Sequence, residues 1–173
     1  AEMDPVLLDL FAAFPTPVTL AEFTDPRVRL IPTDPRRFLR RSPDAYDVIL
    51  IGFSDPSTLQ ANRLLTQEFL HLARSRLNPG GILALGIPGG LSYLPEETQE
   101  IQNTLWHTAG TAFRYVRVLP GEGRTLFLAS ESNLSNLAPE SILARASQRN
   151  LFDGIPVPWH VEQRLHPAWD EWF

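Results

Sequence analysis

The turn from Gly52 to Ser57 holds the polar side chains best placed for chemistry in this chain. It interrupts a continuous apolar run, Val48 to Ile51, with glycine, serine, aspartate and proline, the residues typical of tight turns. Ligands of open α/β sheets bind at the carboxyl ends of the strands, so a turn in this place predicts a site. Within the turn, Asp55 offers a carboxylate for acid–base chemistry.

Two further aspartates, Asp4 and Asp34, also stand directly before proline. Asp-Pro commonly begins a helix, because the carboxylate accepts hydrogen bonds from the first backbone N–H groups and proline presets the backbone angle. Capping or turn formation is therefore the plain interpretation of all three Asp-Pro pairs. The four histidines show no ligand spacing and cysteine is absent, so no metal site is predicted.

The residues on either side of the turn predict one strand–helix–strand unit, which positions the turn. The apolar run at 48–51 is typical of a parallel strand buried on both faces. Apolar residues at helical spacing predict a helix from Thr58 to about Leu77. Asn78 to Gly81 then ends the helix before a second strand, Ile82 to Leu85. The candidate site is the first turn of this βαβ unit.

Further helices and strands are predicted on both sides of the unit. The upstream elements are a helix from Asp4 to about Phe14, a short strand Val28–Ile31 and a short helix Arg36–Arg41. The downstream elements are a flexible loop Gly86–Gly90 over the site mouth, a helix from Pro95 to about Ala112, and an antiparallel hairpin of Phe113–Leu119 with Arg124–Ser130. A helix from Pro139 to Arg149 and a tail rich in proline and tryptophan follow.

Composition limits the classes of protein to consider. The chain has 173 residues, 43% of them hydrophobic, which suits one compact domain. With 15 Lys and Arg against 20 Asp and Glu, the net charge of −5 argues against binding nucleic acid. No apolar run approaches the roughly 20 residues that cross a bilayer. We expect a cytoplasmic protein, or the soluble part of a membrane-anchored one.

Several of these segments together resemble the polyamine aminopropyltransferases, the spermidine synthase family. The matching motifs are Tyr46–Ile51, Ser54-Asp55-Pro56, Leu64–Phe69 and Leu77–Gly81, within a resemblance that spans about residues 1 to 130. The resemblance implies a Rossmann-like sheet of the S-adenosylmethionine-dependent methyltransferase type, flanked by helices, with the C-terminal hairpin antiparallel. It also implies binding of decarboxylated S-adenosylmethionine and a polyamine as substrates, with no tightly bound cofactor. Bacterial domains that follow a membrane-spanning segment in a longer chain look most similar.

The resemblance assigns roles to three acidic residues. Glu2 matches the glutamate that holds both ribose hydroxyls of the nucleoside, and Asp34 matches the aspartate that accepts a hydrogen bond from the adenine amino group. At the central turn the family usually has an aspartate at the strand end and a second one three residues later, before proline. Asp55 matches the second and inherits a catalytic role, whereas Gly52 occupies the position of the first.

That glycine bears on the expected activity. An alkylammonium has a pKa of about 10, so it must lose a proton before it attacks, and the strand-end carboxylate of the family is placed to accept that proton. Leu119, just before Pro120, stands where the family has a tyrosine that contacts the acceptor. A positioned general base contributes about 10²–10⁴-fold in rate, so we expect impaired or altered catalysis unless Asp55 substitutes.

The sequence also lacks the family's first strand, its glycine-rich loop and most of its second strand. We therefore expect residues 1–138 to be an N-terminally truncated α/β domain on which 139–173 packs. Unpaired strand edges expose backbone groups, so either the strands pair anew or a second copy of the chain covers the edge, as a homodimer.

Three functions remain open. The first is an aminopropyltransferase-type domain of impaired or altered activity, which the resemblance favours. The second is a noncatalytic regulatory or interaction module on the same fold, which Gly52 and Leu119 favour. The third is a small-molecule S-adenosylmethionine-dependent methyltransferase, although the sequence contains no Asn-Pro-Pro-aromatic segment of the kind that amino-methylating enzymes use.

Overall fold

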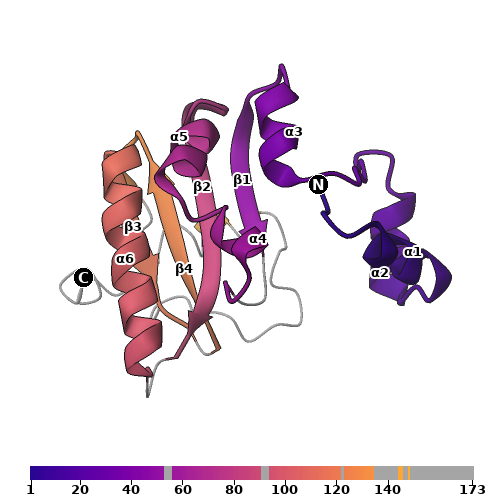
Figure 1. The fold of residues 1–173 in the computed structure, drawn as a ribbon. Helices are drawn as coiled ribbons and strands as arrows, with labels where there is room; N and C mark the ends of the chain where they lie inside the picture. The colour runs from indigo at the N-terminus through magenta and orange to yellow at the C-terminus, as the bar shows by residue number, and fades with distance from the viewer. Residues whose placement is uncertain (53–55, 91–93, 122, 135–143, 146–147, 149–173) are drawn as a thin grey trace. The chain divides into compact units, whose positions relative to one another are not determined.

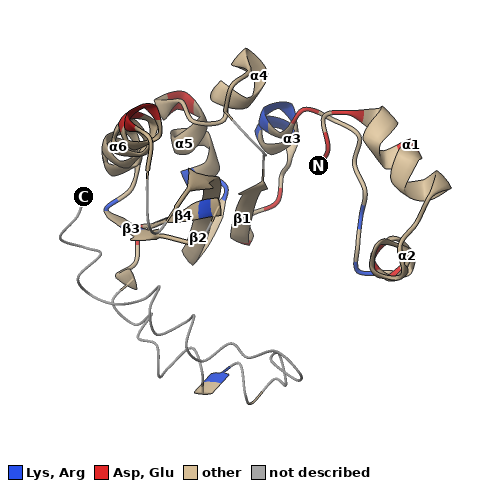
Figure 2. Ribbon diagram, turned by 90° about the horizontal axis from the view of Figure 1, so that it is seen from below, with Lys and Arg blue, Asp and Glu red and all other residues tan. Residues whose placement is uncertain are grey.

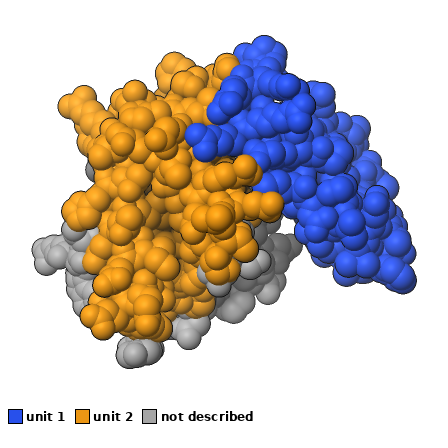
Figure 3. All heavy atoms as spheres, viewed as in Figure 1, with its two compact units in different colours: residues 1–44 blue, residues 45–173 orange. Residues whose placement is uncertain are grey.

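The computed structural model describes residues 1–52, 56–90, 94–121, 123–134, 144–145 and 148 (Figure 1). The chain forms two compact units, Ala1–Asp44 and Ala45–Phe173, which are coloured separately in Figure 3. The predicted helix Pro139–Arg149 and the tail after it lie almost entirely outside the described residues. Each unit is described below by itself.

Three helices make up most of the first unit: α1 (Pro5–Ala13), α2 (Pro17–Thr24) and α3 (Pro35–Arg41). Each follows a polar residue that caps it, because Asp4, Thr16 and Asp34 all accept hydrogen bonds from backbone N–H groups of the first turn. The predicted starts of α1 and α3 are confirmed. The sequence interpretation missed α2, although Thr16 followed by proline is the same starting signal.

The predicted strand Val28–Ile31 is not formed. Among the described residues this segment joins the chain's first residues only through an isolated parallel bridge between Glu2 and Pro32. Val28 and Leu30 remain exposed. A strand requires neighbours along its whole length, and one bridging residue does not provide them.

The second unit is built on a four-stranded sheet in the order β1-β2-β4-β3 (Figure 1). Its strands are β1 (Tyr46–Gly52), β2 (Leu77–Gly89), β3 (Tyr115–Leu119) and β4 (Gly123–Ser130), and its helices are α4 (Leu59–Asn62), α5 (Gln67–Arg74) and α6 (Glu96–Ala112). β1 and β2 are parallel, whereas β4 runs antiparallel to both β2 and β3. The predicted βαβ unit, the helix α6 and the C-terminal hairpin are all confirmed.

Two details of the central unit differ from the prediction. The single helix predicted from Thr58 to Leu77 is divided into α4 and α5, because Thr66 adopts an extended backbone and caps α5. β2 is longer than predicted and includes both Asn78–Gly81 and Gly86–Gly89. The second of these segments is therefore not a loop, since Gly86 pairs with β1 and with β4.

The core lies between the sheet and the helices α5 and α6, which share one face of it (Figures 1 and 2). Alternate strand residues point into this core, namely Ile49, Ile51, Leu83, Leu85, Ile87, Phe127 and Ala129. On the other face of β1, Val48 is 59% exposed and Leu50 is 68% exposed. The expectation that β1 is buried on both faces is therefore wrong, because β1 is an edge strand covered on one side. The central strand β2 is buried on both faces.

Gly81 allows β1 and β2 to approach closely, and its replacement by alanine is expected to destabilise the protein. A Cβ atom at this position would lie 2.9 Å from the Asn78 carbonyl oxygen and 3.0 Å from that of Tyr46. Because both neighbours are backbone atoms, they cannot rotate away, and we expect Gly81→Ala to cost about 1–3 kcal/mol.

Chemical denaturation of the full chain measures this cost. Gly110 is the matched control, since it is exposed in α6 and a Cβ there meets no atom within 4 Å. Gly110→Ala is expected to stabilise the chain by about 0.5–1 kcal/mol through helix propensity. Equal effects of the two substitutions would contradict the close approach at Gly81.

No single helix among the described residues is long and apolar enough to cross a membrane. Only together do α1 and α2 reach the length and composition of a membrane-crossing segment, and the two helices are bent by 112° to each other.

Candidate functional site

Two of the three predicted acidic residues lie near each other in the first unit. Glu2 donates its backbone N–H to the Ile31 carbonyl at 3.0 Å and accepts from the Thr33 N–H at 2.9 Å. These bonds place Glu2 beside Pro32, two residues before Asp34. The structure thus brings Glu2 and Asp34 to the ends of two neighbouring parallel segments.

The two carboxylates have different local partners. Glu2 is half-buried and its Oε1 accepts from the Asp4 N–H at 2.9 Å, while its Oε2 bonds to no described residue. Asp34 uses Oδ1 to accept from the N–H groups of Arg36 and Arg37, at 2.9 and 3.1 Å. The capping interpretation of Asp34 is therefore confirmed. Its role toward a nucleoside remains a prediction.

The strand-end position in the second unit is open. Gly52 ends β1 and pairs with Gly86 of β2. A Cβ atom built on Gly52 would meet nothing within 4 Å, so the backbone there leaves room for a side chain. Asp55, the predicted catalytic residue, lies outside the described residues. Leu119 is the last residue of β3, as expected, and contributes no polar group.

The sequence interpretation missed Arg124, which lies close to this strand end. Arg124 is near the start of β4 and pairs with Pro88 of β2. Its side chain passes over Gly86, since a Cβ there would lie 3.0 Å from Arg124 Cδ and 3.4 Å from its Nη1. The only signal in the sequence is an arginine in place of an apolar residue directly after the hairpin turn.

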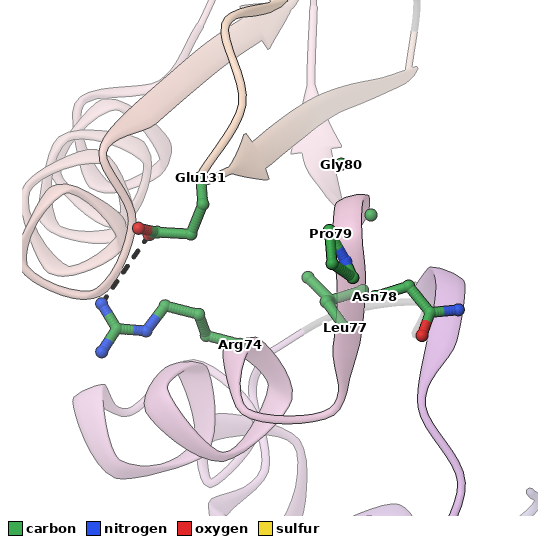
Figure 4. A pocket seen from close by; sticks show the side chains of 7 residues that line it. Arg74, Leu77, Asn78, Pro79, Gly80 and Glu131 are labelled. Carbon is green, nitrogen blue, oxygen red and sulfur yellow. Dashed lines mark ion pairs between the residues drawn. The ribbon is translucent and has the colours of Figure 1, made fainter.

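A shallow pocket of about 220 Å³ lies at the other end of β2 (Figure 4). Arg74 and Glu131 face each other across it, with Arg74 Nη1 3.7 Å from Glu131 Oε1. The same Nη1 donates to the Ala112 carbonyl at 2.7 Å, so the arginine ties α5 to the end of α6. The pocket lies at the amino-terminal end of β2, away from Gly52.

The other titratable residues that the structure describes supply no metal site. Among the described residues no group of three His, Asp or Glu side chains could hold a metal ion. The Arg27 guanidinium bonds to Asp25 at 2.6 Å and holds the pKa of that carboxyl below its usual value. This pair lies in an exposed turn after α2 and stabilises that turn locally.

Comparisons with known proteins agree with this architecture. Residues 1–138 match the family described as the spermine/spermidine synthase domain. A polyamine aminopropyltransferase of Synechococcus sp. (strain JA-2-3B'a(2-13)) is 42% identical over 162 residues, which are 83% of this chain and 52% of that protein. The chain spans about half, or less, of the length of the curated relatives it matches.

Two solved structures show the same fold. A spermidine synthase in complex with the transition state analogue AdoDATO has a TM-score of 0.64 and 20% identity, over 76% of this chain and 45% of that one. Human methyltransferase-like protein 13 in complex with SAH has a TM-score of 0.63 and 18% identity, over 87% of this chain and 68% of that one. The predicted methyltransferase-type α/β fold is confirmed, and the chain belongs to the spermine/spermidine synthase domain family.

Proposed function

We propose that this chain is the nucleoside-binding part of an aminopropyltransferase-type protein, with impaired or altered catalysis. Glu2 would hold the ribose hydroxyls and Asp34 would accept from the adenine amino group. The parallel bridge between Glu2 and Pro32 supports this proposal, because it places both carboxylates at neighbouring segment ends.

The ligand would be decarboxylated S-adenosylmethionine or a closely related nucleoside, bound as a substrate. Two structural neighbours support this class, since one is in complex with AdoDATO and the other with SAH. A polyamine would be the second substrate, as the names of the relatives suggest.

The observation that carries the proposal of altered catalysis is the bare strand end at Gly52. The position has space for a side chain but supplies no carboxylate to accept the proton of an attacking amine. Asp55 would be the remaining acid of the turn and the catalytic residue of any transfer that persists. A noncatalytic binding module on the same fold is the second candidate, which the same glycine and Leu119 favour.

Nucleoside binding by the natural full-length protein tests the proposal, with calorimetry of 5′-methylthioadenosine as the measurement. We expect Asp34→Ala to weaken this binding roughly 10-fold or more, because a hydrogen bond to a charged group contributes about 1.5–3 kcal/mol. The same substitution removes a helix cap, which alone costs about 0.5–2 kcal/mol of stability.

Asp4→Ala is the matched control for that loss of a cap. Asp4 caps α1 by accepting from the Val6 N–H at 2.9 Å and also precedes proline. It is expected to cost similar stability and to leave nucleoside affinity unchanged. If both variants bind as the wild type does, Asp34 serves only as a cap and the proposed adenine contact is wrong.

A further inference from the structure

The side chain of Arg124 lies on the face of the sheet toward which a side chain at position 52 would project. Gly52 and Gly86 are paired across the parallel strands, so a side chain on either would project from the same face. The Cδ and Nη1 atoms of Arg124 lie 3.0 and 3.4 Å from the position of a Cβ on Gly86. Gly86 thus leaves the space that the arginine occupies, and the arginine side chain lies over the residue that pairs with Gly52.

This guanidinium is available to a ligand. Arg124 is exposed, and its side chain makes no ion pair or hydrogen bond with any residue that the structure describes. An arginine remains charged at all physiological pH values and offers paired N–H donors that match a carboxylate. The helices α5 and α6 lie on the opposite face of the sheet, so neither of them covers the face on which Arg124 lies.

Among the residues that the structure describes, the charged group beside Gly52 is therefore a cation, the reverse of what a diamine requires. An ammonium near Gly52 would face a cation and, among the described residues of β1 and β2 at this end, no carboxylate. The Arg124 guanidinium would repel an ammonium group in this place, whereas it would attract a carboxylate.

We propose that Arg124 binds a carboxylate of the ligand beside Gly52, so that this site selects an acid-bearing compound over a purely cationic one. The inference rests on the proposed function, because it assigns a substrate class to the proposed aminopropyltransferase-type activity. The carboxylate has two sources, the amino-acid tail of S-adenosylmethionine itself or an acceptor that carries a carboxylate.

Two matched pairs of ligands test the inference by calorimetry on the natural full-length protein. S-adenosylmethionine and its decarboxylated form differ by one carboxylate on the tail. In the presence of 5′-methylthioadenosine, 4-aminobutyrate and putrescine differ by a carboxylate in place of an ammonium. We expect the acid-bearing member of at least one pair to bind roughly 10- to 100-fold more tightly, and the pair that shows it identifies the source.

Substitutions then assign the preference to the arginine. Arg124→Gln is expected to abolish it, and Arg124→Lys is expected to retain part of it through the remaining charge. Arg114→Gln is the control, since Arg114 is an exposed arginine before β3, at the far end of the sheet, and its removal changes the net charge equally.

The outcomes separate this inference from the proposed function. If the nucleosides bind but neither acid-bearing compound is preferred, or if Arg124→Gln retains the preference, the inference is overturned and nucleoside binding stands. If neither nucleoside nor 5′-methylthioadenosine binds, the proposed function fails and this inference fails with it.

Discussion

Gly52→Asp is expected to raise the rate of aminopropyl transfer from decarboxylated S-adenosylmethionine to putrescine by about 10²–10⁴-fold in the natural full-length protein. A positioned carboxylate would accept the proton that an alkylammonium must lose before it attacks, and general bases contribute in this range. The substitution is sterically permitted, because a Cβ at this position meets no atom within 4 Å. Release of 5′-methylthioadenosine measures the rate.

Gly52→Asn is the control for the size and polarity of the new side chain. It is nearly isosteric with aspartate but cannot accept a proton at neutral pH, so it is expected to leave the rate near that of the wild type. A Gly52→Asp protein that binds the nucleoside but shows no gain would show that the missing carboxylate is not what limits catalysis.

Arg124 makes the same experiment more discriminating. A guanidinium beside the new carboxylate would lower its pKa and weaken it as a base, and it would also repel the diamine. The double variant Gly52→Asp with Arg124→Gln is therefore expected to exceed Gly52→Asp by roughly 10-fold, if the pKa of the new carboxylate recovers by about one unit. Arg124→Gln alone supplies no base and is expected to give no such gain. If the rate of the double variant equals the product of the two single effects on the rate, the two positions do not interact.

The sequence predicted well those elements whose signals are local. The caps at Asp4 and Asp34 predicted the starts of α1 and α3, and the glycine-containing turn after Pro120 predicted the hairpin of β3 and β4. The apolar run at 48–51 predicted β1 and its parallel pairing with β2. Each of these signals lies within a few residues of the element it determines.

Features that depend on distant residues were not predicted. Val28–Ile31 has the composition of a strand, but strand formation depends on neighbours that only Glu2 supplies among the described residues. Gly86–Gly89 has the composition of a loop but pairs on both sides within the sheet. Arg124 lies over Gly86 only because β4 lies beside β2, a pairing that no local pattern reveals.

Ile51→Ala is expected to cost about 2–5 kcal/mol of unfolding free energy, far more than the same change at the preceding residue. Ile51 is 8% exposed and points toward the helix side of the sheet, so truncation leaves a cavity in the core. Leu50 is 68% exposed on the opposite face, and Leu50→Ala is expected to change stability by less than about 0.5 kcal/mol. Chemical denaturation of the full chain at several protein concentrations measures both.

The concentration series also tests whether a second copy of the chain covers the face of the sheet on which Leu50 lies. If a second copy of the chain covers this face, Leu50 is buried in the dimer and Leu50→Ala weakens self-association. Its cost then grows with protein concentration, because dimerisation stabilises the folded state by mass action. A cost that is small and independent of concentration would contradict a dimer through this face, and a large cost at every concentration would mean that another part of the same chain covers it. The cost of Ile51→Ala, by contrast, depends on packing against α5 and α6 of the same chain and stays large in every case.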